Sequence, residues 1–398
     1  MITMRQITRI ALGLFISSSF YLSAKDLPLD ISNYLRVEYD DNVFTTGEGD
    51  GTGPVESFVI IEQIEFLLDS QAGNTYYGLR YIPTFKYFEN RPGDDTDINN
   101  QVDLILNHDF TPRTSTQLKY SFRQADEPEL VEDDVSFRNN NDYMYNSVNL
   151  DLVTQVIPEK TSLKASGRYV DFAYDDDQVA ETSDYQEATG GFDIIQVLQP
   201  TANLAAQFRY TNLDYTAEFR DADTIQGGLS LNKVFNPKLD GDVRFGYESH
   251  DPSDPASQDT DSPYGNISVR YQPLKGRRFT LGLGYAQDKS AVNTFTMQER
   301  FTATLAYAND LTAALTFTIA GTYALGDYSM DNTTSVYDPA VDTDGDEETI
   351  YLSTSLDYNI NVRNAMVLSY QYSDLDSDVR PTSDYDRNRI SLGWKYSL

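Results

Sequence analysis

The chain has 398 residues, a formal net charge of −32 at pH 7 and no cysteine. Nucleic-acid binding is excluded because it requires a basic footprint. The absence of cysteine excludes disulfides, thiolate metal sites, a cysteine nucleophile and a lipid-modified cysteine.

Residues 1–24 have the layout of a secretory signal peptide, which is removed from the mature protein. Two arginines form its positive start, an apolar run ends at Phe20, and Ser23-Ala24 offers small residues for cleavage. Leu22 is larger than the usual residue at the third position before the cut, so the exact site stays open. No later segment has the roughly 18 apolar residues of a membrane-spanning helix. We therefore assign 25–398 to one exported domain.

Between acidic stretches, the chain alternates apolar and polar residues with a period of two. In the segment 279–286, Phe, Leu, Leu and Tyr alternate with Thr, Gly, Gly and Ala, and the pattern recurs in 118–123, 315–323 and 389–398. Successive side chains of a strand point to opposite faces, so each segment has one apolar and one polar face. The apolar face repeatedly ends in tyrosine, as the aromatic girdles of a membrane barrel require. The acidic stretches are predicted to be solvated loops.

Short and long connections alternate along the chain, which indicates a repeat of β-hairpins. We predict an all-β fold, a transmembrane up-and-down antiparallel β-barrel of about 18 strands, within a range of roughly 16 to 20. An even count places both termini and the short turns in the periplasm and the long acidic loops outside. Segments 56–68 and 186–198 alternate least clearly. The loops predicted to face outside include 125–141, 250–262 and 326–348.

The chain ends on a predicted strand with an apolar residue at every second position. These residues are Ile390, Leu392, Trp394, Tyr396 and Leu398. The pattern resembles the assembly signal of outer-membrane proteins, in which the last residue is usually phenylalanine instead of the leucine found here. This resemblance implies recognition by the barrel-assembly machinery. The alternative is an ordinary edge strand.

The first predicted strand ends in the motif Tyr39-Asp40-Asp41-Asn42-Val43-Phe44. It resembles the tyrosine-acid-acid-asparagine-apolar-phenylalanine stretch near the mature N-terminus of the outer-membrane β-barrel porin family of porin-2-like barrels. Members of this family are often encoded near exopolysaccharide or exosortase systems. The resemblance implies a porin-like barrel in the bacterial outer membrane. It carries over no catalytic residue, because the family has no agreed ones.

Strand parity sorts the charged residues between the two faces of the predicted wall. If the aromatic face meets lipid, the cations belong to the other face, because near the bilayer midplane a lipid-facing cation costs about 2–4 kcal/mol. The cations assigned to the lumen are Arg80, Lys86, Lys119, Arg123, Lys164, Arg168, Arg209, Arg244, Arg270, Arg300, Arg389 and Lys395. The acids of the same parity are Asp103, Asp151, Asp193, Glu248 and Asp357, so the predicted wall is more basic than acidic. Such a wall is either a ladder of neutralising ion pairs or the lining of an anion-selective pore.

The chain offers few residues for catalysis or metal binding. His108 lies near a predicted short turn and His250 enters an acidic stretch, and neither stands in a catalytic motif. We predict no enzyme and no required cofactor. Carboxylates crowd around a glycine in one acidic stretch and resemble part of a calcium loop without its complete spacing. The residues that would bind Ca²⁺ there are Asp342, Asp344, Asp346 and Glu348; the alternative is a solvated acidic loop.

Three functions fit these features. The first is a channel for the diffusion of small hydrophilic, preferably anionic, solutes. The second is an export conduit for an acidic exopolysaccharide, and the third is a non-conducting structural or adhesion barrel. The expected partners are outer-membrane lipids and lipopolysaccharide, the barrel-assembly machinery, and a small solute or a polysaccharide, with a homo-oligomer compatible with all three functions.

Overall fold

The computed structural model of the protein describes residues 29–47, 53–125, 142–290, 292–336, 344–379 and 384–398. Its 18 strands form one antiparallel sheet that closes on itself. Closure follows because β1 (Leu29–Asp40) pairs with both β2 (Ser57–Ala72) and β18 (Tyr385–Ser397). The predicted closed barrel is confirmed, and the predicted signal peptide lies outside the described residues.

Each strand from β2 to β17 pairs with the strand before it and the strand after it in the sequence, as an up-and-down barrel requires. The remaining strands are β3 (Thr75–Phe88), β4 (Thr96–Thr111), β5 (Thr114–Ala125), β6 (Tyr143–Ile157), β7 (Thr161–Tyr174), β8 (Tyr185–Gln199), β9 (Ala202–Tyr215), β10 (Ala222–Asn236), β11 (Leu239–Pro252), β12 (Thr260–Leu274), β13 (Arg277–Lys289), β14 (Met297–Asp310), β15 (Leu315–Tyr328), β16 (Gly345–Asn361) and β17 (Asn364–Ser377). The described parts of the connections hold three short helical segments: α2 (Asp177–Ser183), η1 (Glu218–Arg220) and η2 (Met330–Asn332). In the described part of the chain, no helix has the length and apolar character needed to cross a membrane.

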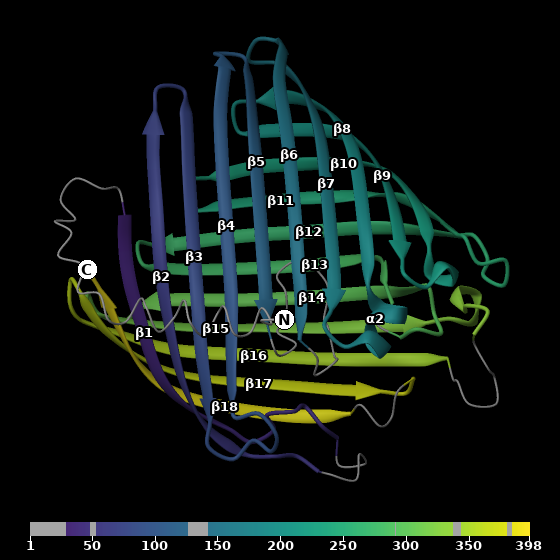
Figure 1. Ribbon diagram of the computed structural model, residues 1–398. Coiled ribbons are helices and arrows are strands. Elements are labelled where there is room, and N and C mark those ends of the chain that lie inside the picture. The colour runs from purple at the N-terminus through teal and green to yellow at the C-terminus, as the bar shows by residue number, and fades with distance from the viewer. Residues whose placement is uncertain (1–28, 48–52, 126–141, 291, 337–343, 380–383) are drawn as a thin grey trace, which may run out of the picture.

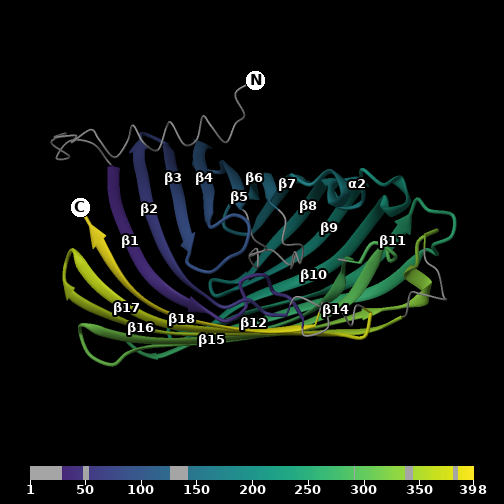
Figure 2. The ribbon, with the colours of Figure 1, turned by 60° about the horizontal axis from the view of Figure 1, so that its bottom comes forward.

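The first and the last nine strands form two opposing curved walls (Figure 2). The walls join where β1 pairs with β18 and, on the other side, where β9 pairs with β10. In Figure 1 the strands of the two walls cross in projection, because strands of a closed barrel are tilted to its axis. We call the place where β1 meets β18 the seam.

The predicted short turns all join neighbouring strands at one end of the barrel, which we call the short-turn end. Local chemistry explains their tightness. In the turn between β16 and β17, the side chain of Asn361 accepts hydrogen bonds from the backbone N–H groups of Arg363 and Asn364. In the turn between β12 and β13, Gly276 has φ of +79°, a conformation that glycine adopts without strain. The other end carries the long connections, and we call it the long-loop end.

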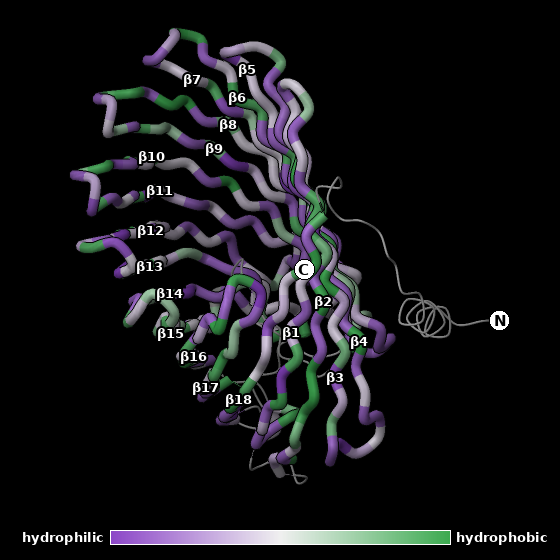
Figure 3. Tube along the Cα trace, turned by 90° about the vertical axis from the view of Figure 1, so that its left-hand side faces the viewer, coloured by the Kyte–Doolittle hydropathy of each residue, from purple (hydrophilic) through white to green (hydrophobic). Residues whose placement is uncertain are grey.

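The two faces of the wall differ in polarity, as Figure 3 shows by the alternating colours along the strands. On β11, Phe245 and Tyr247 are 56% and 55% exposed, whereas Glu248 is 1% exposed. We therefore call the face of Phe245 the lipid face and the face of Glu248 the lumen face.

The segments that alternate least clearly, 56–68 and 186–198, fall in β2 and β8 and are strands as predicted. On β2 the lumen face is itself apolar at the long-loop end. Val59 and Ile61 pack there against Val43 of the connection between β1 and β2. The inward fold of this connection therefore explains why both faces of β2 are apolar.

A second apolar cluster fills the lumen face at the long-loop end of β5 to β9, where α2 packs against it. Its buried members are Ala125, Tyr143, Tyr145, Val170, Phe172, Tyr174, Tyr185, Leu213 and Tyr215. The rings of Phe172 and Tyr185 are stacked with centroids 5.4 Å apart. The two apolar clusters therefore cover the lumen face at the long-loop end of these strands.

Candidate functional site

The strand register places all the predicted lumen cations on the lumen face. On β5, for example, Lys119 and Arg123 alternate with Leu118 and Tyr120 and lie on the face of Ser121, whose hydroxyl donates to Asp103 at 2.7 Å. The acids of the same parity share that face. The structure adds lumen-facing charges that the sequence interpretation omitted, including Arg36, Arg387, Glu65, Glu187, Asp240 and Asp288.

Most of these cations have a carboxylate partner, usually on a neighbouring strand. The pairs are Arg80 with Glu65 (2.8 Å) and Asp103 (3.9 Å), Lys164 with Asp151 (3.0 Å), Arg168 with Glu187 (3.7 Å), Arg209 with Asp193, Arg270 with Asp240 (3.9 Å), Arg300 with Asp288 (3.9 Å) and Lys395 with Asp357 (3.9 Å). Lys86 is buried directly opposite Asp97 in the register of β3 and β4. Much of the lumen face is therefore a ladder of neutralising pairs.

A glycine makes room for the pair of Arg209 and Asp193. Arg209 donates to both carboxylate oxygens of Asp193 and lies across Gly191 of β8. A Cβ atom at Gly191 would lie 2.4 Å from Cδ of Arg209. Gly191, one of the two glycines that blur the alternation of β8, thus has a packing reason, whereas a Cβ atom at Gly190 would meet no other atom within 4 Å.

Four of the predicted cations have no carboxylate within ion-pair distance among the described residues. These are Lys119, Arg123, Arg244 and Arg389. Nε of Arg123 and Nε of Arg389 are buried without a hydrogen-bond partner. An unpaired cation attracts a passing anion with its full charge, whereas the charge of a paired cation is largely cancelled by the protein carboxylate beside it.

Lys119 and Arg123 meet in a hollow of about 430 Å³ in the wall formed by β3 to β6, which we call the basic hollow. Arg80 and one carboxylate, Asp103, also line it, together with tyrosine, serine and asparagine side chains. Tyr145 in its wall accepts a hydrogen bond from Arg168 at 3.4 Å. Arg80 is paired with Glu65 and Asp103, so the positive charge of the basic hollow comes from Lys119 and Arg123.

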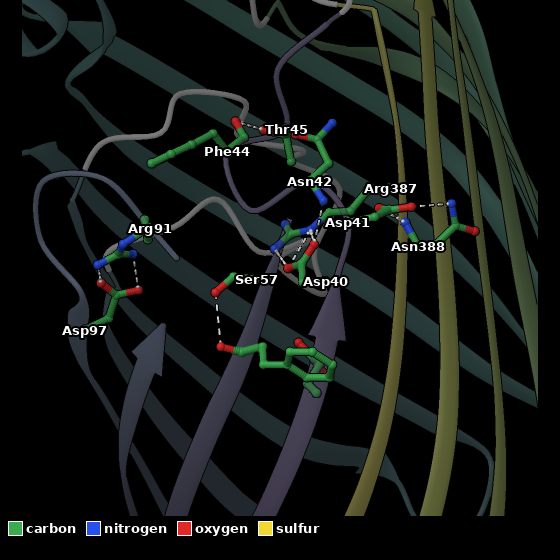
Figure 4. A network of polar contacts seen from close by, with 12 residues as sticks. Asp40, Asp41, Asn42, Phe44, Thr45, Ser57, Arg91, Asp97, Arg387 and Asn388 are labelled. Carbon is green, nitrogen blue, oxygen red and sulfur yellow. Dashed lines mark hydrogen bonds and ion pairs between the residues drawn. The ribbon is translucent and has the colours of Figure 1, made fainter. Parts of the chain in front are cut away.

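The motif that ends the first strand lies at the seam (Figure 4). Arg387 of β18 donates from Nε to both oxygens of Asp40, at 3.0 and 3.1 Å, and both side chains are buried. Asp41 accepts from the backbone N–H and Nδ2 of Asn388, at 2.6 and 2.9 Å. Asn42 donates to the carbonyl of Asp386 at 3.0 Å. Three consecutive residues of the motif therefore fasten β1 to β18.

The rest of the motif directs the chain into the barrel. Val43 donates its N–H to the carbonyl of Val55 at 2.9 Å and is buried in the first apolar cluster, against which Phe44 packs. Tyr39 points to the lipid face and donates to Glu56 at 2.6 Å. The motif is thus a structural device for closing the barrel.

The connections at the long-loop end hold one another through Arg220 of η1, which is buried. Arg220 donates to the carbonyls of Thr182 (2.8 Å) and Ser290 (2.7 Å) and to Asn293 (3.0 Å), and its guanidinium lies 4.2 Å from the ring centroid of Tyr215. It therefore joins the connections that follow β7, β9 and β13. We call this contact set the Arg220 latch.

The connection between β11 and β12 is fastened similarly to the one between β15 and β16. Asp254 accepts from the backbone N–H of Ser335 at 2.7 Å and of Ala256 at 2.9 Å. Burial raises the pKa of Asp254, but these hydrogen bonds outweigh it and hold the pKa below its usual range. Nothing in the sequence pattern signals such contacts, because they join loops far apart in the chain.

Neither histidine lies in a catalytic arrangement among the described residues. Nδ1 of His108 lies 2.8 Å from the hydroxyl of Thr75, and Nδ1 of His250 lies 3.0 Å from that of Thr224. His250 is completely buried. Each ring is held by a neighbouring strand rather than by an acid and a nucleophile.

The predicted calcium loop is only partly described, because Asp342 lies outside the described residues. Asp346 and Glu348 belong to β16 and face outward, opposite Asp327 and Leu325. The described residues hold no cluster of three or more possible metal ligands. Calcium binding there stays a prediction.

The residues of the predicted assembly signal face lipid. Ile390, Leu392 and Trp394 are about half exposed, and Nε1 of Trp394 donates to Asn364 at 3.0 Å. Leu398 is anchored by its backbone N–H, which donates to the carbonyl of Ile31 at 3.0 Å. Recognition by the assembly machinery stays a prediction.

A closed barrel with an apolar exterior, aromatic residues on its lipid face and a charged lumen face defines a porin-like outer-membrane β-barrel. The model of the family described as putative beta-barrel porin 2 matches residues 33–397. The chain belongs to this family, which confirms the resemblance seen in the sequence, and it is located in the bacterial outer membrane. No curated protein matches the chain.

Solved structures share the fold at low sequence identity. The chain is similar to OccK2 (OpdF) of Pseudomonas aeruginosa in complex with glucuronate, with 14% identity and a TM-score of 0.50 over 93% of this chain and 98% of that one. It is similar to OccAB2 of Acinetobacter baumannii, with 13% identity and a TM-score of 0.50 over the same shares. These similarities support the barrel architecture.

Proposed function

We propose that the protein is a diffusion channel for small hydrophilic solutes that prefers anions and has no catalytic activity. The basic hollow carries this proposal, because Lys119 and Arg123 face the lumen and have no carboxylate partner in the part of the chain that the structure describes. Guanidinium and ammonium groups in this state engage carboxylates and phosphates of a passing solute.

Charge elsewhere on the lumen face has less influence on selectivity. A paired cation and its carboxylate produce opposing fields that largely cancel a few ångströms away. The acidic long loops attract cations to the mouth, but salt screens that attraction within about 10 Å at 0.1 M. The unpaired cations of the wall therefore dominate at moderate ionic strength in a narrow lumen.

The hollow also suits a solute with a ring. Tyr76 and Tyr145 supply aromatic surface, and Ser121, Ser147 and Asn149 supply hydrogen-bonding groups beside the cations. The structure of OccK2 holds glucuronate, a sugar acid with this combination of groups. A sugar carboxylate is therefore the first solute to test.

Planar-bilayer recordings of the unmodified protein test the proposal. The reversal potential in a gradient of potassium chloride should show that chloride passes more readily than potassium. Glucuronate should reduce the chloride current more than glucose does at equal concentration. A cation-selective channel would contradict the anion preference, and the absence of conductance would instead favour a structural or adhesion barrel.

A further inference from the structure

Asn33 of β1 and Glu62 of β2 form a polar pair among the apolar residues of the lipid face. Nδ2 of Asn33 donates to Oε1 of Glu62 at 3.0 Å. In the strand register Glu62 stands between Leu35 of β1 and Phe85 of β3. Leu35 is 41% exposed on the lipid face, which places Glu62 on the same face.

The position of Glu62 along its strand places it well inside the apolar band. The lipid-facing residues beyond it are Phe58 and Ile60 in one direction and Ile64 and Phe66 in the other. Within the described strands, no other Asp, Glu, Lys or Arg side chain has two apolar lipid-facing residues on each side along its strand. The remaining lipid-facing carboxylates lie near the long-loop end of their strands.

The pair leaves hydrogen-bonding groups unused. Asn33 has a second N–H and a side-chain carbonyl, and Glu62 has a second oxygen. No other described residue bonds to these groups. Lipid tails offer neither donors nor acceptors, so polar groups at this depth need a protein partner.

We propose that this face is an interface between two copies of the chain, related by a two-fold axis along the membrane normal. The donors and acceptors of Asn33 and Glu62 are self-complementary, so each pair satisfies the other in the isologous contact that a two-fold axis creates. Lys233, a lipid-facing cation of β10, is not an alternative partner for Glu62 of a second copy. It lies only three residues from the short-turn end of its strand, whereas Glu62 lies well inside the apolar band. Leu35, Val37 and Ile60, which are 41–49% exposed, form the apolar surface around the pair.

Disulfide cross-linking in native membranes tests this interface directly, because the chain has no cysteine of its own. Two copies of Leu35→Cys should cross-link, since position 35 adjoins Glu62 close to the proposed axis. The matched control is Leu229→Cys on β10, which is 39% exposed on the opposite side of the barrel. It should cross-link at least tenfold less.

The same experiment in an E62L background should reduce the Leu35→Cys cross-link by about tenfold. Heat-modifiable migration shows whether each variant still forms a barrel. Light scattering of the unmodified protein in mild detergent should give the mass of two chains. A monomer or trimer, equal cross-linking at the two positions, or a cross-link that E62L leaves unchanged in a folded barrel would overturn the proposal.

Discussion

The seam and the basic hollow contain the same kinds of charged residue, but these residues have different roles. At the seam, Arg387 and Asp40 are 5% and 1% exposed and satisfy each other. In the basic hollow, Lys119 and Arg123 face the lumen, and no acid among the described residues lies within ion-pair distance of them. The difference teaches that a lumen-facing charge stabilises the barrel when it is paired and buried, and acts on solutes when it is left unpaired.

Removing the end of the last strand should break the seam most severely. Deleting Tyr396, Ser397 and Leu398 removes the pairing of Ser397 with Ser32 and the anchor of Leu398 on Ile31. It leaves an open sheet edge and takes away two residues of the assembly signal. We expect almost complete loss of the heat-modifiable barrel in isolated outer membranes. A truncated protein that inserts and migrates normally would show that this end of the seam is dispensable.

Breaking the buried pair of the seam should have the next largest effect. Asp40→Ala leaves the Arg387 guanidinium buried without its carboxylate, which costs about 3–5 kcal/mol of unfolding free energy. Denaturant unfolding in detergent measures this loss. Lys164→Ala on β7, which removes one member of a pair whose side chains are 27% and 32% exposed, should cost about 1 kcal/mol or less. Equal costs for the two variants would contradict the distinction between buried and lumen-exposed pairs.

Breaking the Arg220 latch at the long-loop end should affect folding less than breaking the seam. Arg220→Ala removes the bonds to Thr182, Ser290 and Asn293. We expect the barrel to remain intact, with faster protease cleavage in the connections that follow β7 and β13 and noisier open-channel current. Arg270→Ala, in a pair far more exposed to the lumen, is the control and should change neither property. An unchanged cleavage rate for Arg220→Ala would show that the latch does not order these loops.

Parity in the sequence was sufficient to place the predicted cations on the lumen face, because a strand has a strict period of two. It did not reveal the partners Glu65 and Glu187, which lie in the two segments where the alternation fails. In 56–68 the inward loop makes the lumen face apolar, and in 186–198 two glycines interrupt the pattern. The sequence interpretation therefore overestimated how basic the wall is, since these acids neutralise Arg80 and Arg168.

Contacts between segments far apart in the chain were harder to predict from the sequence. Arg387 shares its parity with Arg389 and was detectable as a lumen-facing cation. Its pairing with Asp40, 347 positions away, depends on barrel closure. The motif around Asp40 indicated the family, but only the closed barrel reveals its physical role. The Arg220 latch has no sequence signal, because it joins loops whose positions are set by the strands beneath them.

The most direct test of the account compares the unpaired cations with a neutralised pair. One variant carries Lys119→Ser and Arg123→Ser, and the control carries Lys164→Ser and Asp151→Ser, which removes one cation and its acid together. Two charges acting at about 8 Å in water-like surroundings contribute about 1 kcal/mol, so the first variant should lose up to about fivefold in the permeability ratio of chloride to potassium. The control should keep the ratio of the unmodified channel. Equal ratios in all three proteins, measured from reversal potentials at 0.1 M salt, would contradict the claim that the unpaired cations of the basic hollow set the selectivity.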